Sequence, residues 1–117
     1  MSQSVILDLL PQTTYNGGGT AVVYTVTGNS QPAAGYYLGN QDLQTINYRM
    51  ANVTGNLKIE ASLASSPTAN DWFQVYSFEA NATTTSAYHN IEGNFVYLRA
   101  KLEDFSQGIL NYVKLSY

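Results

Sequence analysis

Apolar and polar residues alternate along most of this chain with a period of two, which is typical of half-buried β-strands. The clearest case is "LKIEASL" (57–63), where Leu, Ile, Ala and Leu lie on one face and Lys, Glu and Ser on the other. In "FVYLRAKL" (95–102) the same alternation sets Arg and Lys opposite Val, Leu and Ala. A helix would repeat its apolar residues every three or four positions, so these segments predict strands.

Applied to the whole chain, this pattern predicts about eight strands. They cover residues 4–10, 20–27, 36–38, 43–50, 57–63, 73–78, 95–102 and 109–117. The Asn- and Gly-containing "ANVTGN" (51–56) and "EDFSQG" (103–108) are predicted to turn the chain, and "EANATTTSAYHNIEGN" (79–94) to be a long polar connection. Short strands at this spacing predict an all-β fold. We expect an antiparallel two-sheet sandwich of jelly-roll type, formed by one domain over residues 1–117.

Two further structural expectations follow from the strand pattern. Residues 1–11 are interpreted as the first strand of the sandwich, with a docking arm for a partner as the alternative. The predicted core is made of the inward-facing aliphatic side chains, namely Leu57, Ile59, Leu63, Val96, Leu98 and Leu115.

Composition changes the picture by excluding several classes of function. Of the 117 residues only 11% are charged, against a usual value of about 25%. The five Lys and Arg residues are scattered singly and the net charge is −3, so we expect no nucleic-acid binding. There is no cysteine, which excludes disulfides and thiolate metal sites.

The chain also lacks the apolar segments that membrane proteins need. No run of 18 apolar residues occurs, so we expect no membrane span. "MSQSVILDLLPQ" (1–12) has neither a basic leading region nor a small-residue cleavage site, so we expect no signal peptide and folding in a cytoplasm.

The segment "ASSPTANDWF" (64–73) contains the single tryptophan, Trp72. In the first interpretation Trp72 closes the end of the sandwich as part of the core, and Asp71 accepts hydrogen bonds from loop amides. In the second, Trp72 is exposed and stacks on a sugar ring or a partner chain. We favour the first, because a lone Trp beside alternating apolar residues is usually buried.

Tyrosine is abundant, with ten residues. Tyr36 and Tyr37 are adjacent, so they point to opposite faces of any strand and one of them should be exposed. Tyr15, Tyr88 and Tyr112 also fall near loops or on outer faces. Exposed Tyr among Ser, Thr and Asn suits contacts with proteins or carbohydrates, whereas cross-strand aromatic pairing would only steady a sheet. We take Tyr36, Tyr37, Trp72 and Tyr112 as candidate contact residues.

No constellation of residues predicts catalysis. His89 is the only histidine and is expected to be a solvated loop residue, with no serine nearby in a nucleophile-elbow context. The eight acidic residues cannot be placed as a pair across one pocket. "GNQD" (39–42) and "AND" (69–71) offer oxygen ligands, but neither has a calcium-loop spacing. We therefore expect a protein that is not an enzyme and carries no cofactor or metal.

Three segments carry a resemblance to a known family. "GNLKIEASLASSPTANDW" (55–72), "GNFVYLRAK" (93–101) and the closing "VKLSY" (113–117) resemble a small β-sandwich module in structural proteins of tailed phages. The likeness covers about residues 35–117 and points to marine and cyanobacterial myoviruses. It implies a virion component in either the capsid or the tail, and it transfers no functional residue.

The residues and the resemblance lead to two main hypotheses. The first is a virion structural protein, assembled in the host cytoplasm, as a capsid decoration or a tail or baseplate part with oligomeric or lattice contacts. The second is a carbohydrate-binding module that contacts a host surface glycan. A third, a small glycosidase, is disfavoured because no acid pair or nucleophile can be placed.

Overall fold

Three strands of 20 residues each form the centre of the fold. The computed structural model describes residues 6–15, 24–33, 43–64 and 66–117. Within these ranges the elements are β1 (Ile6–Leu10), β2 (Thr13–Thr14), β3 (Tyr24–Thr27), β4 (Gln31–Pro32), β5 (Leu43–Ser62), the 3₁₀ helix η1 (Ala69–Asp71), β6 (Phe73–Glu92) and β7 (Tyr97–Ser116). All seven strands belong to one antiparallel sheet in the order β1-β7-β5-β6, with β2, β3 and β4 also paired to β7.

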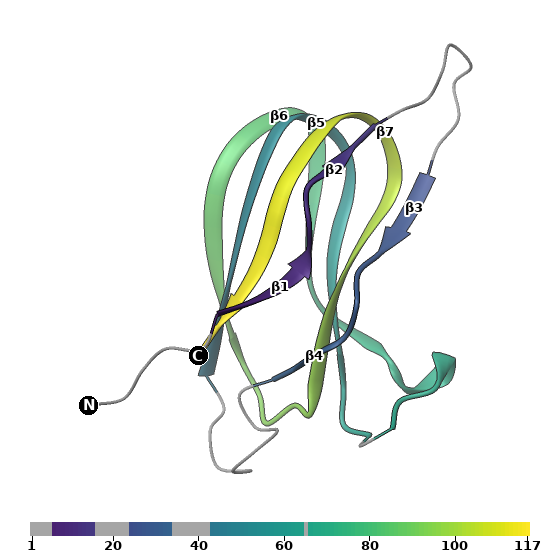
Figure 1. Ribbon diagram of the computed structural model, residues 1–117, viewed down its shortest axis with the longest axis vertical. Coiled ribbons are helices and arrows are strands. Elements are labelled where there is room, and N and C mark those ends of the chain that lie inside the picture. Colours follow the sequence, from purple (N-terminus) through teal and green to yellow (C-terminus); the bar gives the residue numbers. More distant parts are fainter. Residues whose placement is uncertain (1–5, 16–23, 34–42, 65) are drawn as a thin grey trace.

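The long strands are too long to be straight. At about 3.3 Å per residue, 20 residues would span roughly 66 Å, whereas the longest extent of the molecule is 48 Å. In Figure 1, β5, β6 and β7 arch together over the top of the molecule. Each strand therefore contributes one half to each of two layers, and the single sheet folds over on itself as a sandwich.

The strand register defines these two layers. In layer A, residues 43–51 of β5 lie between 83–92 of β6 and 109–116 of β7, with β1 and β2 beyond β7. In layer B, residues 54–62 of β5 lie between 73–80 of β6 and 97–107 of β7, with β3 and β4 beyond β7. The predicted antiparallel, jelly-roll-like β-sandwich is confirmed.

Backbone irregularities lie where the strands cross between layers. Asn52 in β5, Ala82 in β6 and Asp104 in β7 each have a positive φ of 48° to 54°, and Gly108 has φ 91°. The β5 pairings shift register over the same stretch, between residues 50 and 56. Such bulges bend strands and increase their twist, so they supply the curvature of the arch.

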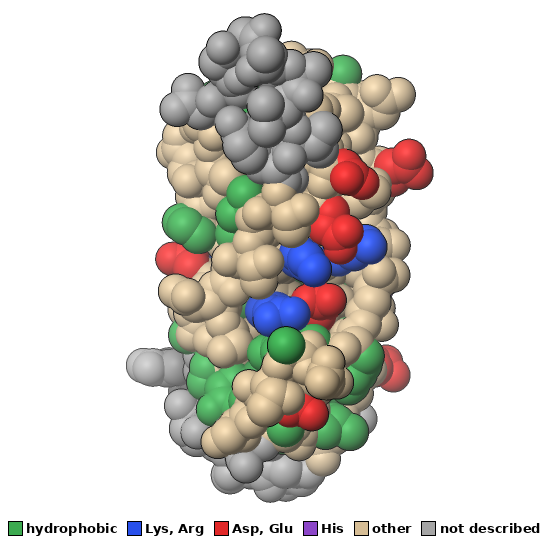
Figure 2. All heavy atoms as spheres, turned by 90° about the vertical axis from the view of Figure 1, so that its right-hand side faces the viewer, with side chains coloured by type: hydrophobic (Ala, Val, Ile, Leu, Met, Phe, Trp, Pro, Cys, Tyr) green, Lys and Arg blue, Asp and Glu red, His purple; other side chains and the backbone are tan. Residues whose placement is uncertain are grey.

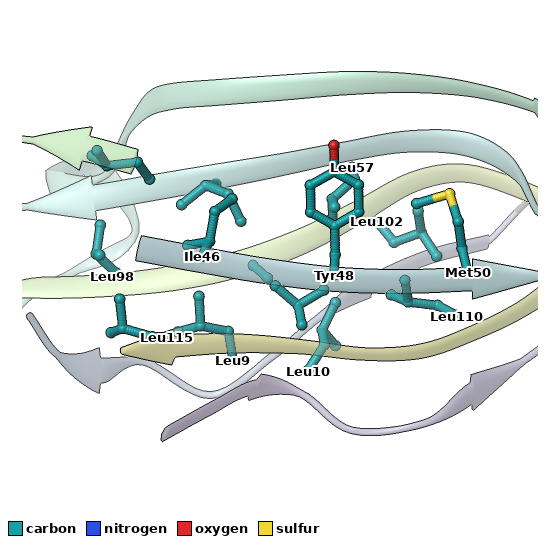
Figure 3. Close-up of a cluster of buried hydrophobic side chains, with 14 of the residues drawn as sticks. Leu9, Leu10, Ile46, Tyr48, Met50, Leu57, Leu98, Leu102, Leu110 and Leu115 are labelled. Atoms are coloured by element: carbon teal, nitrogen blue, oxygen red, sulfur yellow. The ribbon is translucent and has the colours of Figure 1, made fainter. Parts of the chain in front are cut away.

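The core fills the space between the layers. Among the described residues, nineteen buried apolar side chains form one cluster, with contributions from both halves of β5 and β7. Figure 3 shows Leu and Ile side chains from facing strands interleaving, with the ring of Tyr48 among them. No buried side-chain nitrogen or oxygen among the described residues lacks a hydrogen-bond partner.

The two rims of the sandwich are closed differently. On the rim of β1, the Gln31 side chain donates to the Asp8 carbonyl at 3.0 Å, and the Tyr117 hydroxyl donates to the Pro32 carbonyl at 2.8 Å. On the rim of β6, the rings of Tyr76 and His89 stack at 4.1 Å between the layers.

Several sequence expectations need correction. Within the connection expected at 79–94, residues 79–92 are not a loop, because they continue β6 as far as Glu92. The turns expected at 51–56 and 103–108 are bends within β5 and β7, so they lead into the other layer without starting a new strand. The expected strand 36–38, with Tyr36 and Tyr37, lies outside the described residues.

The expected core is right at four of its six positions. Leu57, Ile59, Leu98 and Leu115 are fully buried, and Val96 is half-buried. The prediction for Leu63 is wrong. Its side chain is 62% exposed, because β5 ends at Ser62 and the chain leaves the sheet there.

Candidate functional site

The outer face of layer B carries ion pairs that satisfy its own charges. Arg99 Nε donates to Glu60 Oε1 at 2.8 Å across β7 and β5. Glu103 receives Lys58 at 3.1 Å and Lys101 at 3.8 Å. Figure 2 looks onto this side and shows basic and acidic side chains interleaved along its middle, with hydrophobic side chains below. Each basic side chain of these pairs thus already contacts a carboxylate of the same chain, so this face offers little to an acidic partner.

Trp72 belongs to this outer face. Its ring lies 4.3 Å from the Arg99 guanidinium carbon, and the side chain is half-buried. Glu60, Arg99 and Trp72 therefore form one stack, in which a cation–π contact continues an ion pair. The expectation that Trp72 is part of the core is wrong. Its ring lies outside the sandwich against Arg99, whose side chain points away from the core.

Asp71 positions Trp72 through the preceding loop. Its Oδ2 accepts the Thr68 backbone N–H at 2.6 Å and the Thr68 hydroxyl at 2.9 Å. These two hydrogen bonds hold the pKa of the Asp71 carboxyl below its usual value, and the bond from the Thr68 backbone N–H has the larger effect. The expected capping of loop amides by Asp71 is confirmed.

The outer face of layer A has a different composition. The register places outward side chains of β6, β5, β7 and β1 in rows across the sheet. The three central rows are Asn90–Thr45–Ser116–Ile6, Tyr88–Asn47–Lys114–Asp8 and Ser86–Arg49–Tyr112. Two tyrosines, two cations, the carboxylate of Asp8, hydroxyls and amides thus share one sheet face.

The two cations of this face are not neutralised. Within the described residues, neither Arg49 nor Lys114 forms an ion pair with a carboxylate. Lys114 Nζ lies 5.0 Å from the centre of the Tyr112 ring, a cation–π contact that leaves its charge in place. Asp8 lies opposite Lys114 in the β1–β7 register without forming an ion pair, so both cations keep their charge available beside this acid.

Tyr88 is the most accessible aromatic residue of the face. Its side chain is 70% exposed, and it makes no hydrogen bond or ring contact among the described residues. Beside it, Asn47 Nδ2 donates to the Ala87 carbonyl at 2.9 Å, and the Thr45 hydroxyl donates to Asn90 Oδ1 at 2.7 Å. Neighbouring polar groups are thus held in place around an aromatic ring that is free to contact a partner.

A second candidate is a hollow at the bend of the strands. It measures about 200 Å³, is open to solvent, and is lined by Thr54, Gly55, Asn56, Glu79, Ala80 and Asp104. No group of three or more His, Cys, Asp or Glu in the described part of the chain is arranged to hold a metal ion. No helix within the described ranges is long and apolar enough to cross a membrane.

The titratable groups on the rim of β6 form a structural cluster. The Tyr48 hydroxyl lies 2.9 Å from the Tyr76 hydroxyl, and either can donate. Burial first, and then this bond, raises the pKa of Tyr48 well above its usual value. His89, expected in a loop, lies in β6; it is exposed as expected, and its ring stacks on Tyr76.

Of the candidate contact residues within the described ranges, Tyr112 lies on the outer face of layer A and Trp72 on the opposite side of the sandwich; Tyr36 and Tyr37 lie outside those ranges. The sequence interpretation missed Arg49, Asn47 and Lys114 as a group, because only the β5–β7 register brings them together. The available signal was the alternation in 43–50, which sets Thr45 and Asn47 opposite the buried Ile46 and Tyr48.

Comparisons with known proteins add little to this geometry. No protein-family profile and no curated protein sequence matches the chain. Solved structures that are similar to this chain include a family 29 carbohydrate-binding module from Piromyces equi, at 12% identity and a TM-score of 0.49, covering 98% of this chain and 91% of that one.

Infectious bursal disease virus supplies two further neighbours. The Gx strain structure has 11% identity and a TM-score of 0.47, and the Gt strain structure 11% and 0.37. Each match covers 97% of this chain but only 31% of the viral chain. At these scores and identities the neighbours carry no functional argument.

Proposed function

We propose that this chain is a non-enzymatic structural module of a tailed-phage virion that binds neighbouring virion proteins through the outer face of layer A. The observation that carries the binding role is the set of Tyr88, Tyr112, Arg49 and Lys114 on one sheet face, with both cations unpaired among the described residues. Tyr and Arg are the residue types enriched in protein interfaces and their hot spots.

The contrast between the two outer faces supports this choice of surface. In layer B, Lys58, Arg99 and Lys101 each contact a glutamate, whereas in layer A Arg49 and Lys114 form no ion pair among the described residues. A partner with acidic or carbonyl-rich side chains complements that charge. Each contact needs only modest affinity, because many copies on a symmetric particle bind with avidity.

The virion assignment itself rests on the resemblance of residues 35–117 to the phage module. It agrees with a low charge content of 11% and a surface of Tyr, Ser, Thr and Asn. The module would fold in the host cytoplasm and join the head, as a capsid decoration, or the tail or baseplate.

Mass spectrometry of purified particles tests the assignment directly. We expect many copies of the chain per particle, and its absence from particles would remove the proposal. The surface is tested by complementation with Tyr88→Ala and Arg49→Ala. Each should lower incorporation about ten-fold, as expected for a hot-spot side chain. Gln74→Ala, an exposed change in the layer B half of β6, is the matched control and should incorporate normally.

A second candidate function is carbohydrate binding by the same face. The observation that favours it is the 70% exposed ring of Tyr88 beside the side chains of Asn47 and Asn90. An exposed aromatic ring flanked by amides suits stacking on a host surface glycan. A glycan array distinguishes the two functions: specific binding that Tyr88→Ala abolishes favours the glycan, and a blank array leaves it unsupported.

A further inference from the structure

The outer edge of β6 differs from every other sheet edge in the described structure. β6 is the last strand in the order β1-β7-β5-β6, and no described strand pairs with its far side. A strand at such a position presents unpaired backbone N–H and C=O groups to solvent. This edge is 20 residues long, whereas the strands along the opposite rim have two to five residues each.

The opposite rim carries the features that protect natural edges from pairing. The register of β1 shifts between Asp8 and Leu10, and that of β3 shifts between Tyr24 and Val26. β4 contains Pro32, which has no backbone N–H to donate. Short strands, bulges and proline are the known defences against edge-to-edge pairing.

The layer A half of β6 has none of these defences. It pairs with β5 without a shift from Leu43 opposite Glu92 to Met50 opposite Thr85. β6 contains no Lys, Arg or Pro, although edge strands often carry Lys, and residues 80–91 ("ANATTTSAYHNI") contain no acid either. In the layer B half, in contrast, the pairing of β6 with β5 shifts register between Gln74 and Tyr76, and the strand carries Glu79.

We propose that residues 83–91 of β6 pair antiparallel with the same residues of a second copy of this chain, which continues layer A across a twofold axis. The occupant is a second copy because the segment contains no Lys, Arg, Asp or Glu, so apposing two identical edges brings no like charges of these residues together. Twofold pairing with an identical surface is the commonest arrangement of homo-oligomers.

The centre of the regular stretch sets the register. An axis at Ala87 pairs the whole of 83–91, with Tyr88 opposite Ser86 of the second copy. Outward side chains stay outward, so the outer faces of the two layer A sheets become one continuous surface with both Tyr88 side chains near its middle. In the proposed virion module, this pairing makes a second copy of the chain the partner at the β6 edge, and in that respect the inference rests on the proposed function.

Because the chain has no native cysteine, single-cysteine variants give an unambiguous test. In the purified full chain, Ala87→Cys should form a disulfide-linked dimer under mild oxidation, since cross-strand Cα distances fall in the disulfide range. Thr25→Cys, exposed on β3 at the opposite rim, should stay monomeric. Sedimentation of the unmodified chain should show a species of twice the 12.8 kDa monomer mass that grows with concentration.

A charge placed on the edge tests the same pairing without cross-linking. Ser86→Lys adds like charges on both sides of the axis and should weaken the dimer about ten-fold or more. Thr25→Lys adds the same charge at the other rim and should leave the dimer unchanged. Circular dichroism on both variants verifies that they remain folded.

The outcomes separate this inference from the virion proposal. A folded chain that stays monomeric at all concentrations, or a dimer that ignores Ser86→Lys and cross-links outside 83–91, overturns the edge pairing. Capture of a different virion protein at this edge overturns the second copy as its partner. Absence of the chain from particles overturns the virion proposal and leaves a solution dimer standing.

Discussion

Ile59 and Leu63 stand four positions apart in one alternating pattern, yet they lie in opposite environments. Ile59 is fully buried between the layers, whereas Leu63 is 62% exposed just beyond the end of β5. Alternation assigns both to the same face, since it does not reveal where a strand ends. The structure therefore makes a distinction that the sequence pattern does not.

That distinction gives a paired stability prediction. Ile59→Ala should lower the free energy of unfolding by roughly 2–5 kcal/mol, because it leaves a cavity between packed layers. Leu63→Ala should change it by less than about 0.5 kcal/mol, as exposed substitutions usually do. Urea denaturation of both variants measures the difference, and equal losses would contradict the end of β5 at Ser62.

The hydrogen bond between Tyr48 and Tyr76 should also respond asymmetrically. Tyr76→Phe leaves the buried Tyr48 hydroxyl without its partner and should cost about 1–3 kcal/mol. Tyr48→Phe leaves only the Tyr76 hydroxyl, at the solvent-accessible rim, and should cost about 1 kcal/mol or less. Thermal unfolding of the two variants tests this order, and a larger cost for Tyr48→Phe would reverse the assignment of the buried partner.

Asp71 predicts a local dependence on pH. Its folded-state pKa is lowered by the bonds from Thr68, so the ionised form is the one that the folded loop favours. The stabilisation of the loop by the Thr68–Asp71 hydrogen bonds, here called the anchor, is therefore fully present above the usual carboxyl pKa. It is lost as pH falls through the lower pKa of the folded state. An NMR titration should show the Thr68 amide shifting in that acid range. The shift should vanish in Asp71→Asn, and a pKa at or above the usual value would contradict the anchor.

At the scale of elements, the bends decide how strands become layers. Gly108 has φ 91°, and a Cβ added there would lie 2.2 Å from the Asn52 carbonyl oxygen of β5. Gly108→Ala should therefore destabilise the protein by roughly 1–3 kcal/mol or more. Ala82 has φ 48°, which costs a residue with a Cβ about 1–2 kcal/mol, so Ala82→Gly should stabilise by about 0.5–1 kcal/mol.

Chemical denaturation of these two variants, each measured beside the unmodified chain, gives the test. Opposite signs are expected, since one change adds a Cβ at a positive φ and the other removes it. If both variants destabilise the protein, the left-handed bend at Ala82 does not exist in solution.

The same bends explain what the sequence revealed and what it hid. Alternation located both halves of β5 and β7, because each half buries one face against the core. The signals at 51–56 and 103–108 do mark changes of direction, but the chain passes into the other layer and keeps its pairing with the neighbouring strand. Local sequence shows that a chain bends and cannot show which strand it pairs with afterwards.

Residues 83–92 were mistaken for a loop for a different reason. At the rim of the sandwich, the inward-facing side chains of β6 remain partly exposed to solvent. Thr85, Ala87 and His89 therefore occupy positions that would hold large apolar residues in a central strand. Only Ile91 in this half is fully buried. An edge strand therefore loses the alternation on which the prediction depends, although its three consecutive Thr residues suit a strand.

At the scale of the whole molecule, the basic side chains of the two outer faces differ in whether they form ion pairs. Layer B pairs Lys58, Arg99 and Lys101 with two glutamates. Layer A keeps Arg49 and Lys114 beside two tyrosines, and β6 extends that face to an unpaired edge. The outer face of layer B thus forms its ion pairs within the chain, whereas the outer face of layer A is suited to contacts with a partner.

The most direct test of this account is a cryo-EM map of the particle that carries the chain. We expect density for the sandwich on the capsid or tail, with Tyr88, Arg49 and Tyr112 against a neighbouring protein and the ion pairs of layer B facing solvent. A map in which the outer face of layer A faces solvent and layer B makes the contacts would contradict the account.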